Sequence, residues 1–124
     1  MRFFEKYLTK VDVKKQMAIP SAFREHLPRY EGGRTISFSV HDVSGNQWEN
    51  FGYYIRRKGK DYAKPVFQKN WRKYARAKSL KPGDKIIFRV EENAANGAPR
   101  YTIAAQKKIV ILAMAYFEML LLLL

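Results

Sequence analysis

Cations suited to binding phosphate are concentrated in one quarter of the chain. Between Arg56 and Lys85 stand twelve of the 24 lysines and arginines, opposed only by Asp61 and Asp84. The other residues are nearly balanced in charge, although the whole chain of 124 residues has a formal net charge of +13. Because a phosphate chain is bound best by cations that act together on one surface, this pattern indicates a polyanion-binding protein, with nucleic acid as the leading partner. A solvated charged segment that serves only solubility is the alternative interpretation.

Residues that could carry out catalysis are few. The two histidines, His26 and His41, have no obvious carboxylate partner in the sequence and belong to no metal-binding or phosphate-loop motif. The acidic residues Asp12, Asp61 and Asp84 lack the spacing that a metal-dependent nuclease needs. The absence of cysteine excludes disulfides, thiolate metal sites and a cysteine nucleophile. We therefore expect no enzyme activity, no cofactor, no metal site and no small-molecule substrate.

The elements that must position the basic segment are predicted to be mainly short strands. Alternating apolar residues or aromatic enrichment indicate strands over residues 35–40, 48–57, 85–91 and 100–105. The segment Lys81–Asp84 fits a type II turn, since proline presets φ and glycine accepts a positive φ. The length and the 47% hydrophobic content predict one folded domain with its own core.

Two short helices are predicted to interrupt the strands. Pro20 and Ser21 can start the first, and Pro28 ends it. Asn70 can cap the second, in which helical spacing gives one apolar face to Trp71, Tyr74 and Ala75. That spacing predicts Trp71 as a core residue and leaves four cations mainly toward water: Arg72, Lys73, Arg76 and Lys78. Strands that enclose two short helices predict an all-β barrel or sandwich.

The two ends of the chain differ in character. At the N-terminus Glu5 interrupts any apolar run, so no signal peptide is predicted. Residues 109–124 are apolar except for Glu118, yet these sixteen residues are fewer than the roughly 20 that span a bilayer. We expect a domain over residues 1–112 and an apolar tail of unknown role over residues 113–124, with no membrane partner.

Five short motifs stand in a fixed order along the chain. They are Phe4-Glu5-Lys6 with Leu8-Thr9-Lys10 and Asp12-Val13, then Ile19-Pro20, then Trp71, then Leu80-Lys81-Pro82-Gly83-Asp84, and finally Ile87-Phe88. In order and spacing they resemble the plant-specific B3 DNA-binding domain, over about residues 3–111. The resemblance implies a mainly β fold, a seven-stranded open pseudobarrel with two short helices, which grips the DNA major groove with two arms.

The resemblance maps these arms onto Thr9–Met17 and Ile55–Pro65. In the first arm the candidate DNA-binding residues are Lys10, Lys14, Lys15 and Gln16. In the second arm they are Arg56, Arg57, Lys58, Lys60, Tyr62 and Lys64, and Lys69 completes the set just beyond it. The concentration of charge identifies the second arm independently. Arginine and lysine can donate to guanine O6 and N7, while glutamine can pair with adenine N6 and N7.

Both arms depart from the family pattern. The first is two residues shorter and has no Asn-Arg pair, and the second lacks the Trp-Asn-Ser stretch of the better-known branches. Base specificity therefore does not carry over. For any single lysine, a phosphate contact is favoured over a base contact, because phosphate contacts position a protein without reading sequence.

The predicted function is sequence-specific binding of double-stranded DNA by a transcriptional regulator in the nucleus, with other transcription factors as further partners. The alternative is a basic interaction module that binds RNA, single strands or an acidic protein, with the apolar tail as a docking or membrane-proximal segment. A single-strand platform needs exposed aromatic residues. The aromatic residues here mostly fit strand or helix cores, which favours the duplex.

Overall fold

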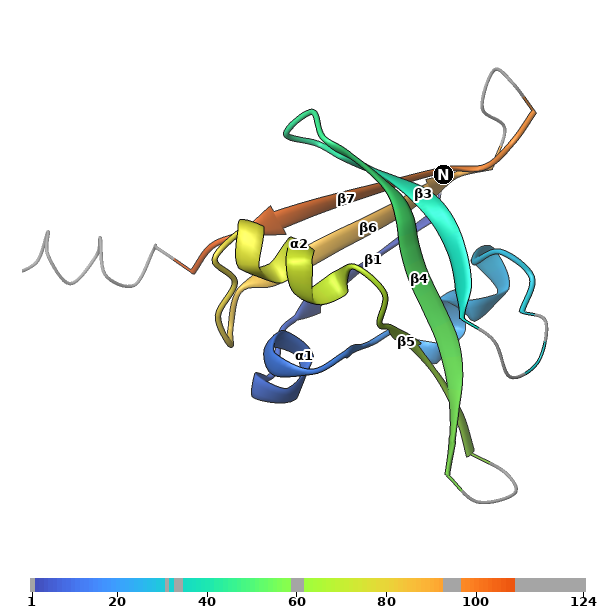
Figure 1. Cartoon of the computed structure of the whole chain (residues 1–124), viewed down its shortest axis with the longest axis horizontal. Coiled ribbons are helices and arrows are strands. Elements are labelled where there is room, and N and C mark those ends of the chain that lie inside the picture. Colours follow the sequence, from blue (N-terminus) through green and yellow to red (C-terminus); the bar gives the residue numbers. More distant parts are fainter. Residues whose placement is uncertain (1, 31, 33–34, 59–61, 93–96, 109–124) are drawn as a thin grey trace, which may run out of the picture.

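One curved, seven-stranded sheet forms the body of the protein (Figure 1). The computed structural model describes residues 2–30, 32, 35–58, 62–92 and 97–108. The strands are β1 (Arg2–Tyr7), β2 (Met17–Ala18), β3 (Ile36–Asp42), β4 (Gln47–Lys58), β5 (Tyr62–Phe67), β6 (Lys85–Glu91) and β7 (Arg100–Gln106). Their order is β1-β6-β7-β3-β4-β5-β2, and every neighbouring pair is antiparallel except β3 and β7. The outer strands β1 and β2 do not pair with each other, so the barrel is open, as predicted.

The strands that the sequence pattern marks agree closely with the structure. The predicted strand over residues 85–91 has the bounds of β6, and those over residues 35–40, 48–57 and 100–105 correspond to β3, β4 and β7. Strand β2 is only two residues long and β5 contains Pro65, so neither offers a clear periodic pattern. Their places follow from the resemblance alone.

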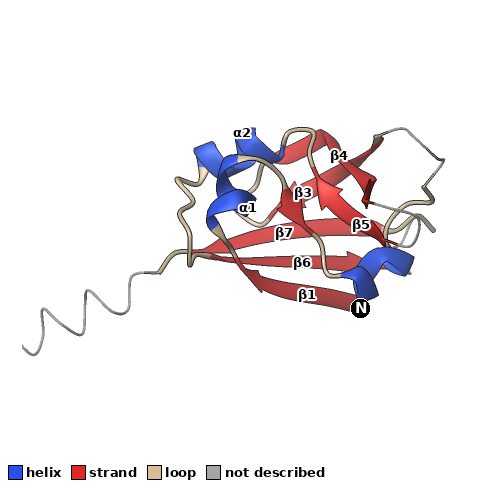
Figure 2. Cartoon of the chain, turned by 90° about the horizontal axis from the view of Figure 1, so that it is seen from below, coloured by secondary structure: helices blue, strands red, loops and turns tan. Residues whose placement is uncertain are grey.

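Helices lie between β1 and β3 and between β5 and β6. Both predicted helices are present, one as the 3-10 helix η1 (Ser21–His26) and the other as the α-helix α2 (Trp71–Ala77). A third, α1 (Lys10–Lys14), was not predicted. It begins with a capping box in which Thr9 and Asp12 bond each other's backbone N–H. Figure 2 shows α1 and α2 together at one end of the sheet.

Two expectations about α2 are wrong. Asn70 stands at the N-cap position, but its φ is +64° and its side chain forms no capping bond. Its amide instead donates to the Asn50 carbonyl oxygen at 2.8 Å, because the strand β4 lies beside the helix start. Lys78 does not face water, since its Nζ lies 2.8 Å from Oδ2 of the buried Asp42. The remaining three cations of the helix are exposed as predicted: Arg72, Lys73 and Arg76.

Aromatic side chains from both halves of the sheet meet in the core. The ring of Phe67 lies 4.9 Å from that of Phe88 and 5.0 Å from that of Phe51, measured between centroids. Phe4 of the outer strand β1 lies 5.6 Å from Phe88. Trp71 is fully buried, which confirms its predicted place in the core. This packing fixes β4 and β5, and therefore their projecting ends, to the body of the domain.

The predicted turn before β6 is present. Gly83 has φ +93°, and the Asp84 N–H donates to the Lys81 carbonyl at 3.0 Å, as a type II turn requires. Among the described residues, no helix has the length and hydrophobicity needed to cross a membrane. The predicted boundary between residues 112 and 113 and the apolar tail lie outside the described residues.

Candidate nucleic-acid interface

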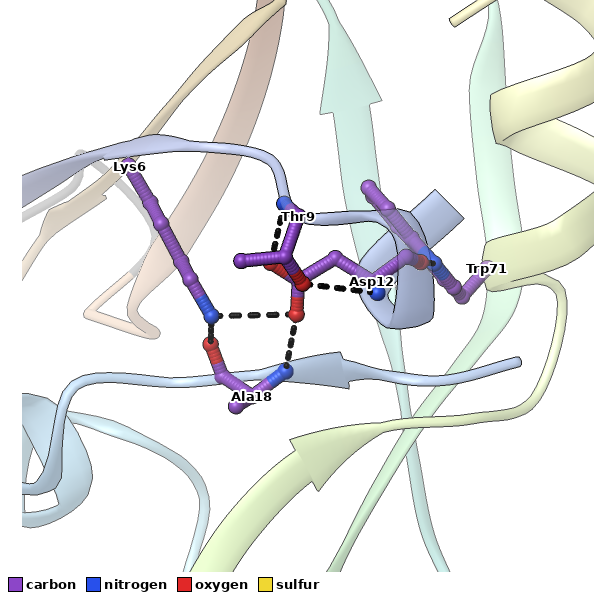
Figure 3. A network of polar contacts seen from close by, with 5 residues as sticks. All are labelled: Lys6, Thr9, Asp12, Ala18 and Trp71. Carbon is purple, nitrogen blue, oxygen red and sulfur yellow. Dashed lines mark hydrogen bonds and ion pairs between the residues drawn. The ribbon is translucent and has the colours of Figure 1, made fainter. Parts of the chain in front are cut away.

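The first arm, Thr9–Met17, connects the two outer strands of the open sheet. Its two ends are held together by the buried carboxylate of Asp12 with Lys6, Thr9 and Ala18, a cluster that we call the neck. Asp12 is 3% exposed. Its Oδ1 accepts from Lys6 Nζ and from the Ala18 N–H, both at 3.1 Å, and its Oδ2 accepts from the Thr9 N–H at 2.8 Å (Figure 3). Lys6 Nζ also donates to the Ala18 carbonyl at 2.6 Å. Side chains thus bridge β1 and β2, which share no backbone pairing.

A second contact fixes the neck to α2. The indole Nε1 of Trp71 donates to the Asp12 carbonyl oxygen at 2.6 Å, in a buried position (Figure 3). Burial alone raises the pKa of the Asp12 carboxyl, but hydrogen bonds from Thr9, Lys6 and Ala18 outweigh burial and hold the pKa below its ordinary value of 3.8. The charged carboxylate is therefore a structural part of the arm.

Helix α1 presents the cations of the first arm to solvent. Asp12 is buried and Val13 half-buried against the core, so the helix has an inner face. Lys10 and Lys14 stand on the exposed remainder of the helix, and Lys15 follows as its exposed C-cap. Within the described part of the chain none of these three lysines forms a salt bridge. They remain available to an anionic partner.

The second arm is the far end of the antiparallel ribbon formed by β4 and β5. Its register pairs Arg56 with Lys64, Arg57 with Ala63 and Lys58 with Tyr62. Two cations directly opposite each other repel, which destabilises a ribbon unless an anion lies between or above them. The Arg56 Nε is buried without a hydrogen-bond partner among the described residues. The opposed charges of Arg56 and Lys64 favour an anionic partner at this position.

The two arms contact each other where they leave the barrel. The hydroxyl of Tyr54, on β4, donates to Oε1 of Gln16, at the end of the first arm, at 3.0 Å. Directly after Gln16, β2 pairs with β5, with Ala18 opposite Val66. Figure 1 shows α1 and the far ends of β4 and β5 on the same lower side of the molecule. Segments about forty residues apart in the sequence therefore meet where the two arms leave the barrel.

Most of the predicted site residues are brought together, but one is not. Lys69 lies beyond the other end of β5, where its carbonyl accepts from the Gly52 N–H at 3.0 Å. Gly52 stands six positions before Lys58 in β4, which corresponds to about 20 Å along a strand. Lys60 lies outside the described residues. The others belong to the two arms: Lys10, Lys14, Lys15, Gln16, Arg56, Arg57, Lys58, Tyr62 and Lys64.

Three residues that organise the site were missed by sequence reasoning. Asp12 and Lys6 hold the neck, and Tyr54 connects the arms. The spacing of Thr9 and Asp12 is that of a capping box and could have predicted α1. No local signal marks Lys6 or Tyr54, since their partners stand 12 and 38 residues away along the chain.

One histidine has carboxylate neighbours that the sequence did not reveal. His26 Nδ1 lies 2.9 Å from Glu92 Oε1, and its Nε2 lies 3.4 Å from Glu25 Oε1. The expectation of a histidine without a carboxylate is wrong for His26, because η1 packs near the end of β6. No group of three or more histidine, aspartate or glutamate side chains able to hold a metal occurs in the described residues.

The comparison with protein families decides what this fold is. Residues 4–107 match the family model described as the B3 DNA binding domain. The chain belongs to the B3 family. The family is a DNA-binding domain of transcription factors and not an enzyme, so the expectation of a non-enzymatic protein is confirmed.

Solved structures give the same fold. The Arabidopsis FUS3-DNA complex has a TM-score of 0.71 and 27% sequence identity, covering 86% of this B3 chain and 98% of that chain. The Arabidopsis thaliana LEC2-DNA complex has a TM-score of 0.68 and 18% identity, covering 84% and 94%. A hypothetical protein of the same plant has a TM-score of 0.57 and 17% identity, covering 84% and 88%. The last two show the fold alone. No curated protein sequence matches this chain significantly.

Proposed function

We propose that this B3 domain binds double-stranded DNA in a sequence-specific way and acts in the nucleus as a transcriptional regulator. One observation carries the proposal: two basic arms from distant parts of the sequence lie on the same side of the molecule and are joined by the Tyr54–Gln16 contact. Membership of the B3 family and the similarity to structures titled as DNA complexes support it.

The shapes of the arms suit the major groove. In B-DNA this groove is about 12 Å wide and admits an α-helix or a two-stranded ribbon. The first arm carries the short helix α1, and the second is the β4–β5 ribbon. We propose that both enter the major groove. The base pairs between the arms then face the region where Tyr54 contacts Gln16.

The candidate residues divide into two roles. Exposed lysines of the first arm, Lys10, Lys14 and Lys15, contact phosphates, because their long side chains reach solvent without an ion-pair partner among the described residues. Arg56 and Gln16 are half-buried and held by the strands or by Tyr54, so they are better placed to read base edges. The cations of the second arm add to the positive electrostatic potential of the ribbon: Arg57, Lys58, Lys60 and Lys64. Tyr62 stands opposite Lys58 in the strand register.

The proposed DNA-binding domain comprises residues 1–112. The family match ends at residue 107 and the last described strand, β7, ends at Gln106. The apolar residues 113–124 stand outside the domain in this proposal.

The decisive experiment is selection of binding sites from random duplexes at a stated salt concentration, followed by competition. The selected duplex should outcompete the same sequence as single-stranded DNA or as RNA. Equal competition by single strands or RNA would instead support a general basic interaction module. Among the residues whose side chains the structure describes, the exposed large aromatic residues are Phe3 and Tyr7, which stand on β1 and not on the arms.

A further inference from the structure

The hydrogen bond from Tyr54 to Gln16 favours one orientation of the Gln16 side-chain amide. Glutamine identifies adenine by accepting from N6 through Oε1 while donating to N7 through Nε2. In this structure one of the two acceptor sites of Oε1 is taken by the Tyr54 hydroxyl at 3.0 Å. The Nε2 amide nitrogen, with two donor hydrogens, has no hydrogen-bond partner among the described residues. The donor end of the amide is therefore the end that stays wholly free for a partner molecule.

Both ends of this contact are held by the fold. Tyr54 lies within the β4–β5 ladder, opposite the fully buried Val66. Gln16 is followed directly by Met17, which is buried and pairs with Phe67. Both Tyr54 and Gln16 are half-buried, so the amide is ordered by the protein before any partner arrives. In the reverse orientation the amide nitrogen would donate to the tyrosine oxygen, and the hydroxyl hydrogen would have to turn to another acceptor.

We propose that Tyr54 is a specificity-determining positioning residue, which orients Gln16 so that this residue reads guanine through its donor hydrogens. Guanine presents only acceptors, N7 and O6, in the major groove, whereas adenine adds a donor at N6 and cytosine presents a donor at N4. A donor-only group favours guanine and meets the N6 hydrogens of adenine unfavourably. The inference rests on the proposed function, because it applies only if the arms enter the major groove.

The test begins by locating the base pair that Gln16 reads. Affinities of the unmodified protein and Gln16→Ala are measured for the selected duplex and for all its single-base-pair variants. Gln16→Ala should lose discrimination at one position, which should hold guanine. There the unmodified protein should prefer guanine to adenine by about tenfold, the range of a specific base contact. Hypoxanthine, which keeps N7 and O6, should bind like guanine.

The second step removes only the hydroxyl of Tyr54. Tyr54→Phe should reduce the preference for guanine over adenine at that position by about fivefold, the worth of one hydrogen bond, while affinity at other positions changes little. The freed amide can then rotate and pair with adenine. In the Gln16→Ala background, Tyr54→Phe should have no further effect on this preference, because the two residues act as one unit.

A matched control separates positioning from stability. Tyr101 also donates a hydrogen bond through its hydroxyl, to the His26 carbonyl at 3.1 Å, far from the arms. Tyr101→Phe should leave all base preferences unchanged. The inference is overturned if Tyr54→Phe keeps the full guanine preference, if the located position holds adenine, or if Gln16→Ala weakens all duplexes equally. If the unmodified protein shows no sequence preference among duplexes, the proposed function itself fails and this inference fails with it.

Discussion

Trp71 of α2 and Asp12 of the first arm are joined by a buried hydrogen bond of 2.6 Å between the indole Nε1 and the Asp12 carbonyl oxygen. Fifty-nine residues separate them in the sequence. The Asp12 carboxylate also accepts hydrogen bonds from Lys6, Thr9 and Ala18. One residue therefore ties the first arm to β1, β2 and α2. The rigidity of the arm therefore depends on the body of the barrel, and this dependence can be measured.

Replacing Asp12 by asparagine should destabilise the domain and weaken DNA binding together. The change removes the charge opposite Lys6 and turns a donor toward the Thr9 N–H, or toward Lys6 and the Ala18 N–H, which should cost about 2 to 4 kcal/mol of unfolding free energy. Loss of the neck should also reduce affinity several-fold at a temperature where the variant is fully folded. Denaturant unfolding and duplex titration measure the two effects.

Asp84→Asn is the matched control for this change. Asp84 is equally buried and accepts from one lysine, Lys107, and from two backbone N–H groups, those of Lys81 and Lys108, each at 2.8 Å. Its replacement should cost similar stability but leave duplex affinity unchanged in the folded protein. Equal losses of affinity in both variants would show that the neck has no special relation to the arm.

Acid should unfold the protein through the three carboxylates that are buried in the described part of the chain. Burial raises the pKa of Asp12, Asp42 and Asp84, but lysine and backbone hydrogen bonds outweigh it and hold each pKa below the ordinary value of 3.8. A folded-state pKa below the unfolded one gives stability that is present above the unfolded pKa and lost as pH falls through the folded value. The unfolding free energy should be nearly constant from about pH 7 to 5 and fall below about pH 4. Asp12→Asn should flatten this fall, and an unchanged free energy at pH 2 would contradict the assignment.

Charge removal on the arms should act differently from charge removal on α2. Arg56→Ala, Arg57→Ala and Lys15→Ala should each weaken binding, and at least one should relax the preference at one base pair by about 1 to 3 kcal/mol. Strand periodicity assigns positions 56 and 57 to opposite faces of the ribbon, so the two arginine variants should not be equivalent. Arg76 is exposed on α2, and Arg76→Ala should have at most a small, sequence-independent effect.

The measurement is a titration of these four variants against the selected duplex and its single mismatches. Equal loss on every duplex for the three arm variants would mean that the arms hold phosphate only. A dominant effect of Arg76→Ala would place the DNA on another face of the domain.

Affinity should depend strongly on salt. With about four to eight phosphate contacts, the logarithm of the binding constant should fall against the logarithm of salt concentration with a slope of about −4 to −7. Lys15→Ala should reduce the steepness by about one phosphate, while Tyr54→Phe should leave the slope unchanged. A slope near zero for the unmodified protein would contradict nucleic-acid binding by these cations.

Removing residues 115–124 should leave the melting temperature and duplex affinity nearly unchanged, because the family match ends at residue 107. Solubility should improve, since a run of leucines forms an apolar patch that favours association. Thermal unfolding and light scattering of the two chain lengths test this. A large fall in melting temperature would show that the tail belongs to the core.

Local patterns in the sequence were enough to predict much of the sheet and the concentration of charge between Arg56 and Lys85. Alternation and aromatic enrichment predicted β3, β4, β6 and β7, since a strand with one buried face must repeat every two residues. The motifs around Phe4, Trp71 and Asp84 predicted the B3 family, which the family comparison confirms. The charge count marked the segment Arg56–Lys85, and the bounds Ile55–Pro65 of the second arm came from the resemblance. Helix α1 was missed although its capping box is local, because five residues are too few for a periodic pattern.

The sequence could not predict the contacts that turn two basic segments into one site. Lys6 meets Ala18, Trp71 meets Asp12 and Tyr54 meets Gln16 only because the open sheet brings its outer strands and the β4–β5 ribbon together. The same packing places Lys69 at the opposite end of the ribbon from Lys58 and pairs Lys78 with Asp42. Composition and periodicity predict local secondary structure and which face of an element is buried. Hydrogen bonds across 38 or 59 residues depend on where strands end in space, which only the packed barrel decides.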